Sequence, residues 1–356
     1  MTRAKFRDKE NEMFGDLLCE LVQIPGPSGF ESRVTARLKE LIQPYVDEVR
    51  IDKIGNLIAR KKGSEGKRSL AIAAHTDEVS LVVVKVDDFV WFDRVGFIDF
   101  HSLPSMPVLI LGAERDIPGV VSASSAHFEK GGDTKMWIDV GDRQKYITPG
   151  DPIVFNLKPH WLDDNKTILA SHAIDDRIGC AALVEIARQL PKRPRHDIYL
   201  VGSSQEEIGS FGIKHFLRQV TPTWLFILDT CYAEDAVPDV KKLLPLNNGL
   251  GLLRFSFTQP KDTCYPGMVN FSSPKLNQRL LDAAKKRSIP LNVCATTGAF
   301  SDANIVYVDN PEIENSHVFM GRRYSHSPHE VIDVNTGVRA ASLLTQAVAD
   351  SEKWED

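Results

Sequence analysis

Hydrophobic and polar positions follow two different periods along this chain, which together predict a mixed α/β fold. Residues 10–23 form an expected helix that ends before Pro25. The runs 46–52, 56–62 and 69–75 are predicted strands, and residues 69–74 (SLAIAA) have the apolar character of a strand covered on both faces. Between the helix and these strands, apolar side chains recur at helical spacing and predict a second helix, at Val34, Leu38, Leu41, Ile42 and Tyr45.

Residues 78–168 interrupt this pattern. The segment is rich in Val, Ile, Phe, Gly and Pro, and it shows no helical period. We therefore expect a small β-domain or barrel, inserted into an α/β domain. Its predicted strands are six short apolar runs: VSLVVVKV (79–86), FVWFDRV (89–95), PVLILGA (107–113), DIPGVVSA (116–123), KMWIDV (135–140) and DPIVFN (151–156).

Helix and strand alternate again after residue 168. Such alternation implies a mixed, mostly parallel sheet with helices on both faces. The chain then divides into a discontinuous α/β domain, residues 1–77 and 169–356, and an inserted β-domain, residues 78–168. The helices expected in the second part cover 177–190, 210–220, 273–288 and 333–352, and the strands cover 197–204, 223–229, 290–295 and 316–321.

Composition and charge are those of a globular enzyme, with 42% hydrophobic and 26% charged residues. A net charge of −5 without a long basic block argues against nucleic acid or a membrane surface as a partner. The N-terminus mixes both signs of charge before any apolar run, unlike a secretory signal. The five scattered cysteines form no CxxC pair, which favours free thiols in a reducing cytoplasm.

Candidate catalytic groups follow directly after predicted strands. Residues 69–74 lead into His75, 197–204 into Glu206, and 223–228 into Asp229. Ligands of open α/β sheets bind beyond the carboxyl ends of the strands, so we expect these side chains to converge. The full group expected there is His75, Asp77, Asp175, Asp176, Glu206, Glu207, Asp229 and His326.

Most of these residues also have a structural explanation. A single histidine after a strand is more often hydrogen-bonded than metal-bound, an aspartate before a helix can cap it, and Asp229 can end a turn. The pair Glu206–Glu207 is harder to explain in this way, because two carboxylates at the end of a buried strand repel each other unless a cation or a proton intervenes. A metal ion meets that requirement, with one carboxylate as ligand and the other free to handle protons.

Seven motifs span almost the whole chain and resemble, in order and spacing, the tetrahedral-aminopeptidase and glutamyl-aminopeptidase family of dinuclear metallo-exopeptidases. The resemblance implies a zinc-exopeptidase type of α/β fold, with the small β-domain inserted where residues 78–168 lie. The motifs are IPGPSGFE (24–31), DKIGNLIA (52–59), AAHTDEVS (73–80), AIDDRIG (173–179), SSQEEIG (203–209), LDTCYAEDA (228–236) and RRYSHSPHE (322–330).

The resemblance implies two divalent metal ions per subunit. Asp175 would bridge the two ions, His75 and Asp229 would complete one site, and Glu207 and His326 would complete the other. Oxygen and imidazole ligands without thiolates suit Zn²⁺ first, and also Co²⁺ or Mn²⁺. Such an enzyme would act on peptides with a free N-terminus.

Two further residues receive roles from the same resemblance. Glu206 would be the general base, which takes a proton from the metal-bound water and returns it to the leaving amine. Asp77 would accept a hydrogen bond from the ring of His75 and fix its tautomer.

Some segments depart from the family pattern without touching a proposed ligand. The segment GAFSDA (298–303) keeps Asp302 but contains Phe300, and AEDAVP (233–238) and GLGLLRFS (249–256) also differ. These departures leave the substrate preference and the assembly open. Arg322 and Arg323 either favour acidic N-terminal residues or form a surface or intersubunit salt bridge.

The resemblance also implies a homo-oligomer, for which a dodecamer is one candidate size, although no residue fixes the copy number. Two other functions remain as alternatives. A metal-dependent deacylase, or another amidohydrolase of the same clan, would keep the metals and change the substrate. A non-catalytic binding protein would keep the fold but would be expected to lose ligands, and here all five remain.

Overall fold

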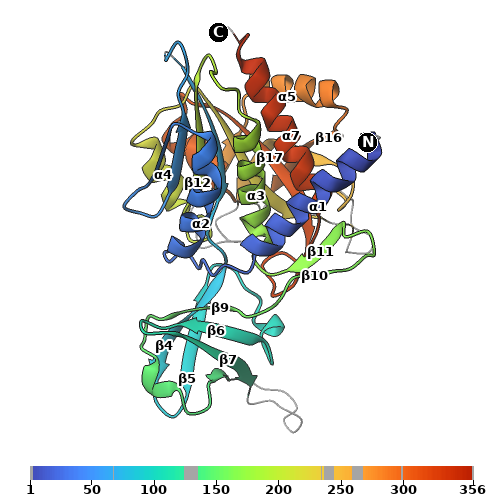
Figure 1. Cartoon of the computed structure of the whole chain (residues 1–356). Coiled ribbons are helices and arrows are strands. Elements are labelled where there is room, and N and C mark those ends of the chain that lie inside the picture. The colour runs from blue at the N-terminus through green and yellow to red at the C-terminus, as the bar shows by residue number, and fades with distance from the viewer. Residues whose placement is uncertain are drawn as a thin grey trace.

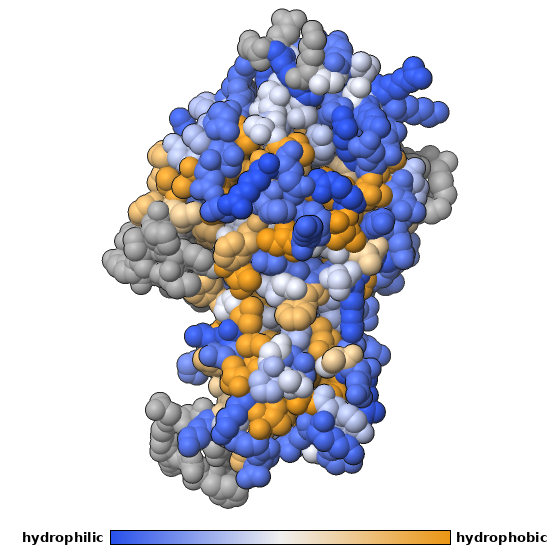
Figure 2. Space-filling model, turned by 90° about the vertical axis from the view of Figure 1, so that its left-hand side faces the viewer, coloured by the Kyte–Doolittle hydropathy of each residue, from blue (hydrophilic) through white to orange (hydrophobic). Residues whose placement is uncertain are grey.

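The computed structural model describes residues 3–66, 68–123, 135–233, 235, 244–258, 268–297 and 300–354. These residues form a large α/β body and a small β-barrel below it (Figure 1). In a space-filling view, hydrophobic side chains gather around the narrow junction between the two parts (Figure 2). The predicted α/β class with a small β-barrel is confirmed.

A mixed sheet, twelve-stranded within the described residues, forms the centre of the body. Its core strands run parallel: β12 (Asp197–Ser203), β3 (Ser69–His75), β13 (Trp224–Tyr232) and β17 (Glu314–Arg323). Antiparallel neighbours extend the sheet in both directions. They include β1 (Glu48–Ile51), β2 (Leu57–Lys61), β10 (His160–Trp161), β11 (Ile168–Ser171) and β18 (Glu330–Asp333), and also β14 (Leu250–Thr258), which pairs with β15 (Met268–Phe271) and runs parallel to β16 (Leu291–Thr297).

Helices cover both faces of this sheet, because alternate residues of each buried strand point to opposite sides. On β3, Leu70 and Ile72 pack into the main core under five helices, and Ala71 and Ala73 pack under the other two. The first group is α1 (Arg3–Leu21), α2 (Ser32–Ile42), α3 (Ile174–Gln189), α5 (Pro274–Arg287) and α7 (Val334–Ser351), and the second is α4 (Phe211–Leu217) and α6 (Asp302–Asp309). Among the described residues, every helix is too short or too polar to cross a bilayer.

The six apolar runs predicted for residues 78–168 contain the six strands of the closed barrel. Alternate side chains such as Leu81 and Val83 fill its interior. The strands are β4 (Ser80–Val86), β5 (Val90–Val95), β6 (Pro107–Leu111), β7 (Asp116–Ala123), β8 (Met136–Asp139) and β9 (Pro152–Phe155), in the order β4–β5–β8–β7–β6–β9. We propose that this barrel makes up most of the inserted domain. The chain would then return to the large sheet through β10 and β11.

Short 3₁₀ turns complete the fold at η1 (Gln43–Tyr45), η2 (Phe100–Ser102) and η3 (Gln144–Tyr146). The first helix differs from its expected range of 10–23, because it begins at Arg3 and ends at Leu21. Elements that the pattern did not predict include β14, β15, β18 and α6.

Candidate active site

The parallel register of the central strands places the predicted site residues at one edge of the sheet. His75, at the end of β3, lies opposite Ser203, at the end of β12, three residues before Glu206. On β13, Ile227 lies opposite Ala73, so Asp229 extends two residues further in the same direction. The expected convergence of these strand ends is therefore present.

Two groups of potential metal ligands meet at Asp175. Its Oδ1 lies 3.1 Å from His75 Nε2, which is 3.9 Å from Asp229 Oδ1. Its Oδ2 lies 3.4 Å from His326 Nε2, which is 3.3 Å from Glu207 Oε2. In each of these groups of three residues, the donor atoms lie within 4.8 Å of one another. Asp175 thus turns one oxygen toward each group.

The same residues carry more negative charge than their neighbours neutralise. Burial, followed by nearby carboxylates, raises the pKa of Glu206 and of Asp229 well above its ordinary value. Burial also raises the pKa of Glu207 to about 7. Carboxylates that are buried close together can ionise together only if a cation is present. These residues therefore have the electrostatic character of a cation-binding site.

The two histidines respond to the same carboxylates. Burial alone would lower the pKa of His326, but Glu207 and Asp175 raise it to about 9. Burial would likewise lower the pKa of His75. The carboxylates of Asp175 and Asp77 outweigh this effect and raise the pKa well above its ordinary value. A bound cation would take the place of these protons, because a metal binds the neutral imidazole.

One orphaned atom supports the fit of these residues to a metal. Glu207 Oε1 is buried and has no hydrogen-bond partner among the described residues. A buried carboxylate oxygen without a partner is costly, and coordination to a cation would satisfy it. His75, Asp175, Asp229, Glu207 and His326 together offer nitrogen and oxygen donors of the kinds that Zn²⁺, Co²⁺ and Mn²⁺ accept.

Asp77 contacts both the ring of His75 and the backbone of the two glutamates. Its Oδ1 lies 3.5 Å from His75 Nδ1 and accepts the backbone N–H of Glu206 at 2.9 Å. Its Oδ2 accepts the backbone N–H of Glu207 at 3.1 Å and the hydroxyl of Ser28 at 2.6 Å. One buried carboxylate therefore holds the backbone of both glutamates.

Glu31 extends this arrangement by one residue, although sequence reasoning gave it no role. Its Oε1 accepts the backbone N–H of Gln205 at 3.0 Å and that of Gly29 at 2.8 Å. Gln205 has a positive φ of 57°, which turns its N–H and those of the next residues toward the two acids. Three successive N–H groups, those of residues 205–207, are thus held by Glu31 and Asp77.

Arg322 is buried against the bridging position and does not lie on the surface. Its guanidinium donates to Asp175 Oδ2 and to Glu330, and its Nε donates to Thr230 Oγ1 at 2.5 Å. Arg322 outweighs the effect of burial and, with the two histidines, holds the pKa of Asp175 well below its ordinary value. Of the two arginines considered from the sequence, Arg323 pairs instead with Asp235 at 2.9 Å.

Two further acids lie beside the ligands. The peptide bond between Asp175 and Asp176 is cis, and Asp176 Oδ1 accepts the backbone N–H of Gly179 at 3.0 Å. Asp302 accepts the Ser203 hydroxyl at 2.6 Å, and burial raises its pKa to about 6. From the sequence, Asp302 stands out only as the residue that GAFSDA keeps from the family pattern, and its place beside the site depends on the packing of α6.

Comparison with known proteins agrees with this geometry. A family model described as M42 glutamyl aminopeptidase matches residues 55–343. The lysyl aminopeptidase of Pyrococcus furiosus is 28% identical over 353 residues, which cover 93% of this chain and 96% of that protein. An aminopeptidase structure from Desulfurococcus kamchatkensis is 26% identical, with a TM-score of 0.86 over 95% of each chain.

The TET1 peptidase of Pyrococcus horikoshii, described as assembling into a tetrahedron or a large octahedral shell, is also similar in fold. It is 24% identical to this chain, with a TM-score of 0.79, over 94% of this chain and 99% of that chain.

Proposed function

Since this chain belongs to the M42 glutamyl aminopeptidase family and is a metal-dependent aminopeptidase, we propose which of its residues carry that activity. His75, Asp175 and Asp229 hold one divalent ion, and Asp175, Glu207 and His326 hold a second. The observation that carries this proposal is the orientation of Asp175, whose two oxygens face the two groups separately.

Zn²⁺ is the proposed metal, and Co²⁺ or Mn²⁺ also suit the donors. When bound, such a pair of ions lowers the pKa of a shared water and polarises the scissile carbonyl. No thiolate takes part in either group of ligands. The binding of the ions would also relieve the repulsion among the buried carboxylates of the site.

Glu206 is the proposed general base. It is buried beside His75 and forms a third candidate ligand group with His75 and Glu207, but it belongs to neither of the two groups that contain Asp175. Burial and the neighbouring Asp229 and Glu207 raise its pKa, which makes its ionised form a stronger base for the proton of the attacking water. Bound cations would favour that ionised form. Glu206 would return the proton to the amine that leaves. The backbone contacts of Glu31 and Asp77 would keep this carboxylate in place.

Peptides with a free N-terminus are the proposed substrates. A deacylase of the same clan would instead accept blocked amines, and a non-catalytic relative would bind metal without turnover. The complete set of ligands and base supports the peptidase over the non-catalytic alternative.

We also propose a homo-oligomer, for which the assembly described for the TET1 peptidase is the support. A cytoplasmic location is proposed from the composition and from the free cysteines Cys19, Cys180, Cys231 and Cys294.

The test is a chelation and reconstitution experiment. Protein stripped with a chelator is assayed against aminoacyl-p-nitroanilides and their N-acetylated forms, before and after addition of Zn²⁺, Co²⁺ or Mn²⁺. We expect activity on the free amines alone, and only after metal is restored. Hydrolysis of the acetylated compounds, or turnover that is insensitive to chelation, would contradict the proposal.

A further inference from the structure

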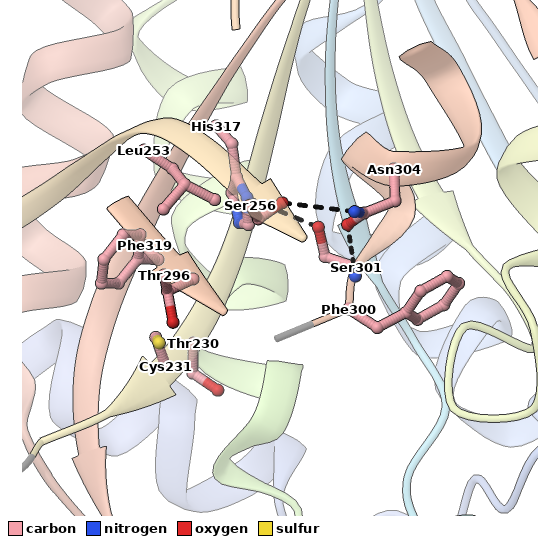
Figure 3. Close-up of a pocket in the computed structure, with 10 residues that line it drawn as sticks. All are labelled: Thr230, Cys231, Leu253, Ser256, Thr296, Phe300, Ser301, Asn304, His317 and Phe319. Carbon is pink, nitrogen blue, oxygen red and sulfur yellow. Dashed lines mark hydrogen bonds between the residues drawn. The ribbon is translucent and has the colours of Figure 1, made fainter. Parts of the chain in front are cut away.

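A small cavity borders the proposed metal centre but contains none of its ligands. Thr230 and Cys231, which follow Asp229 on β13, form part of its wall. Phe319, which also lines it, is the partner of Asp229 in the β13–β17 register. Ser301, on the opposite wall, precedes Asp302. The cavity therefore begins beside a proposed ligand and extends along the sheet face that α6 covers (Figure 3).

His317 is one of the polar residues that line this cavity. It precedes Phe319 by two residues on β17, so it lies one strand repeat further from the metal centre on the same face. Only 5% of the residue is exposed, its Nδ1 lies 3.4 Å from Ser301 Oγ, and its Nε2 has no hydrogen-bond partner among the described residues. Burial lowers the pKa of His317 to about 4, so the ring is neutral near pH 7.

Several other polar groups of the lining are already engaged. Asn304 donates to Ser256 Oγ at 3.2 Å and accepts the backbone N–H of Ser301 at 3.1 Å, as the broken lines in Figure 3 show. His317 Nε2 is thus a buried polar atom that still requires a partner, which is costly unless a ligand or a water supplies one.

Size and charge limit the occupant. The cavity measures about 20 Å³, enough for about one water or the end of a short side chain. Phe319 contributes an aromatic ring, whereas the ring of Phe300 points away from the other lining residues (Figure 3). No charged side chain lines the cavity within the part of the chain that the structure describes. The buried cation beside it, Arg322, is already paired with Asp175 and Glu330. A charged side chain would therefore lose its water without gaining a counter-ion.

We propose that this cavity receives the side chain of the substrate's N-terminal residue and selects a small, uncharged residue that carries a hydroxyl group, namely serine or threonine. The inference rests on the proposed function, because it places the α-amine of the substrate at the metals. The substrate hydroxyl bonds to His317 Nε2, and the small volume of the cavity limits the length of the side chain.

The first measurement compares N-terminal residues on one leaving group. The metal-loaded enzyme is assayed with the p-nitroanilides of serine, threonine, alanine, leucine, glutamate and lysine. A net hydrogen bond contributes about 1 kcal/mol, so kcat/KM for serine should exceed that for alanine about fivefold. Glutamate and lysine should be the poorest substrates of the series.

The second measurement uses His317→Leu. This variant should bring the serine-to-alanine ratio of kcat/KM to about one, with metal content unchanged by elemental analysis. His101→Leu, on an exposed barrel histidine, is the matched control and should keep the ratio of the wild type. Because His317→Leu could fail to fold, His317→Phe is the second variant. It keeps an aromatic ring but has no nitrogen acceptor, so it should also bring the serine-to-alanine ratio to about one.

The outcomes separate the two proposals. Absence of turnover on every substrate after metal is restored would count against the proposed function itself. Turnover with a preference for glutamate or lysine, or an unchanged serine-to-alanine ratio in folded His317→Leu, would overturn the pocket alone. The cavity would then hold no more than a structural water. An unchanged serine-to-alanine ratio in folded His317→Phe would also overturn it.

Discussion

Replacing Asp77 with asparagine tests how one buried carboxylate organises the proposed site. Asp77 has no exposed surface, and its oxygens accept the backbone N–H groups of Glu206 and Glu207 and the Ser28 hydroxyl. Its pKa is lowered despite burial, by His75 and Ser28, so it is ionised. An asparagine has a single oxygen. Whichever way it is turned, its amide NH₂ meets the N–H of one of the two glutamates.

The expected loss of stability follows from the number of donors that Asp77 accepts. Leaving one buried N–H without an acceptor costs about 1–3 kcal/mol, and each of the two remaining bonds loses its charge assistance, about 1 kcal/mol apiece. We expect Asp77→Asn to lower the free energy of unfolding of the metal-free protein by about 3–5 kcal/mol. Because Asp77 also faces the ring of His75, metal affinity should fall by about 10–100-fold.

Urea unfolding of the metal-free protein measures the first effect, and competition with a chelating indicator measures the second. Asp282→Asn is the matched control, since it makes the same chemical change at an exposed position of α5. Its unfolding and metal binding should equal those of the wild type. If Asp77→Asn unfolds at the urea concentration of the wild type and binds Zn²⁺ equally well, the role assigned to Asp77 is wrong.

The remaining predictions concern the metals and protons. Glu206→Gln should keep its full metal content but lose about 10²–10⁴-fold in kcat; near-normal turnover would exclude it as the base. Asp175→Asn should lose metal, and elemental analysis that finds two ions per chain would contradict its bridging role. Burial raises the pKa of Glu207 from 4.5 to about 7, so between these values Glu207 keeps a proton in the folded metal-free protein that it loses in the unfolded chain. Its Tm should therefore fall as the pH rises from about 5 to about 7, while the gain in Tm on adding Zn²⁺ grows. Calorimetry with and without Zn²⁺ checks this, and a Tm gain that shrinks over that range would refute it.

The barrel could be predicted from the sequence because its signal is local. Each strand is a short apolar run between turn residues, and neighbouring runs such as 107–113 and 116–123 pair directly as β6 and β7. The helix α6 could not be predicted in this way. It covers only Asp302–Asp309, too few residues to establish a helical period, and its start depends on a capping box between Ser301 and Asn304.

The candidate ligands could also be expected from the sequence, because the carboxyl ends of parallel strands meet at one edge of a sheet. The residues that hold these ligands in place could not be expected from the sequence. Glu31 comes from a loop before α2, and Glu330 from the first position of β18, and both reach the site only through tertiary packing. The ion-pair partners of Arg322 could not be predicted for the same reason, since the sequence does not show which carboxylates lie within its reach.

The barrel is joined to the body at both ends by segments that carry parts of the proposed site. The outgoing connection runs from His75 through Asp77 to the start of β4 at Ser80, and the returning one passes through β11, which ends four residues before Asp175. Any displacement of the barrel relative to the α/β body would therefore act first on segments next to the candidate catalytic centre. A protein that binds the barrel, or a crosslink that tilts it, would first displace those connecting segments. It would thereby change the positions of the proposed catalytic residues.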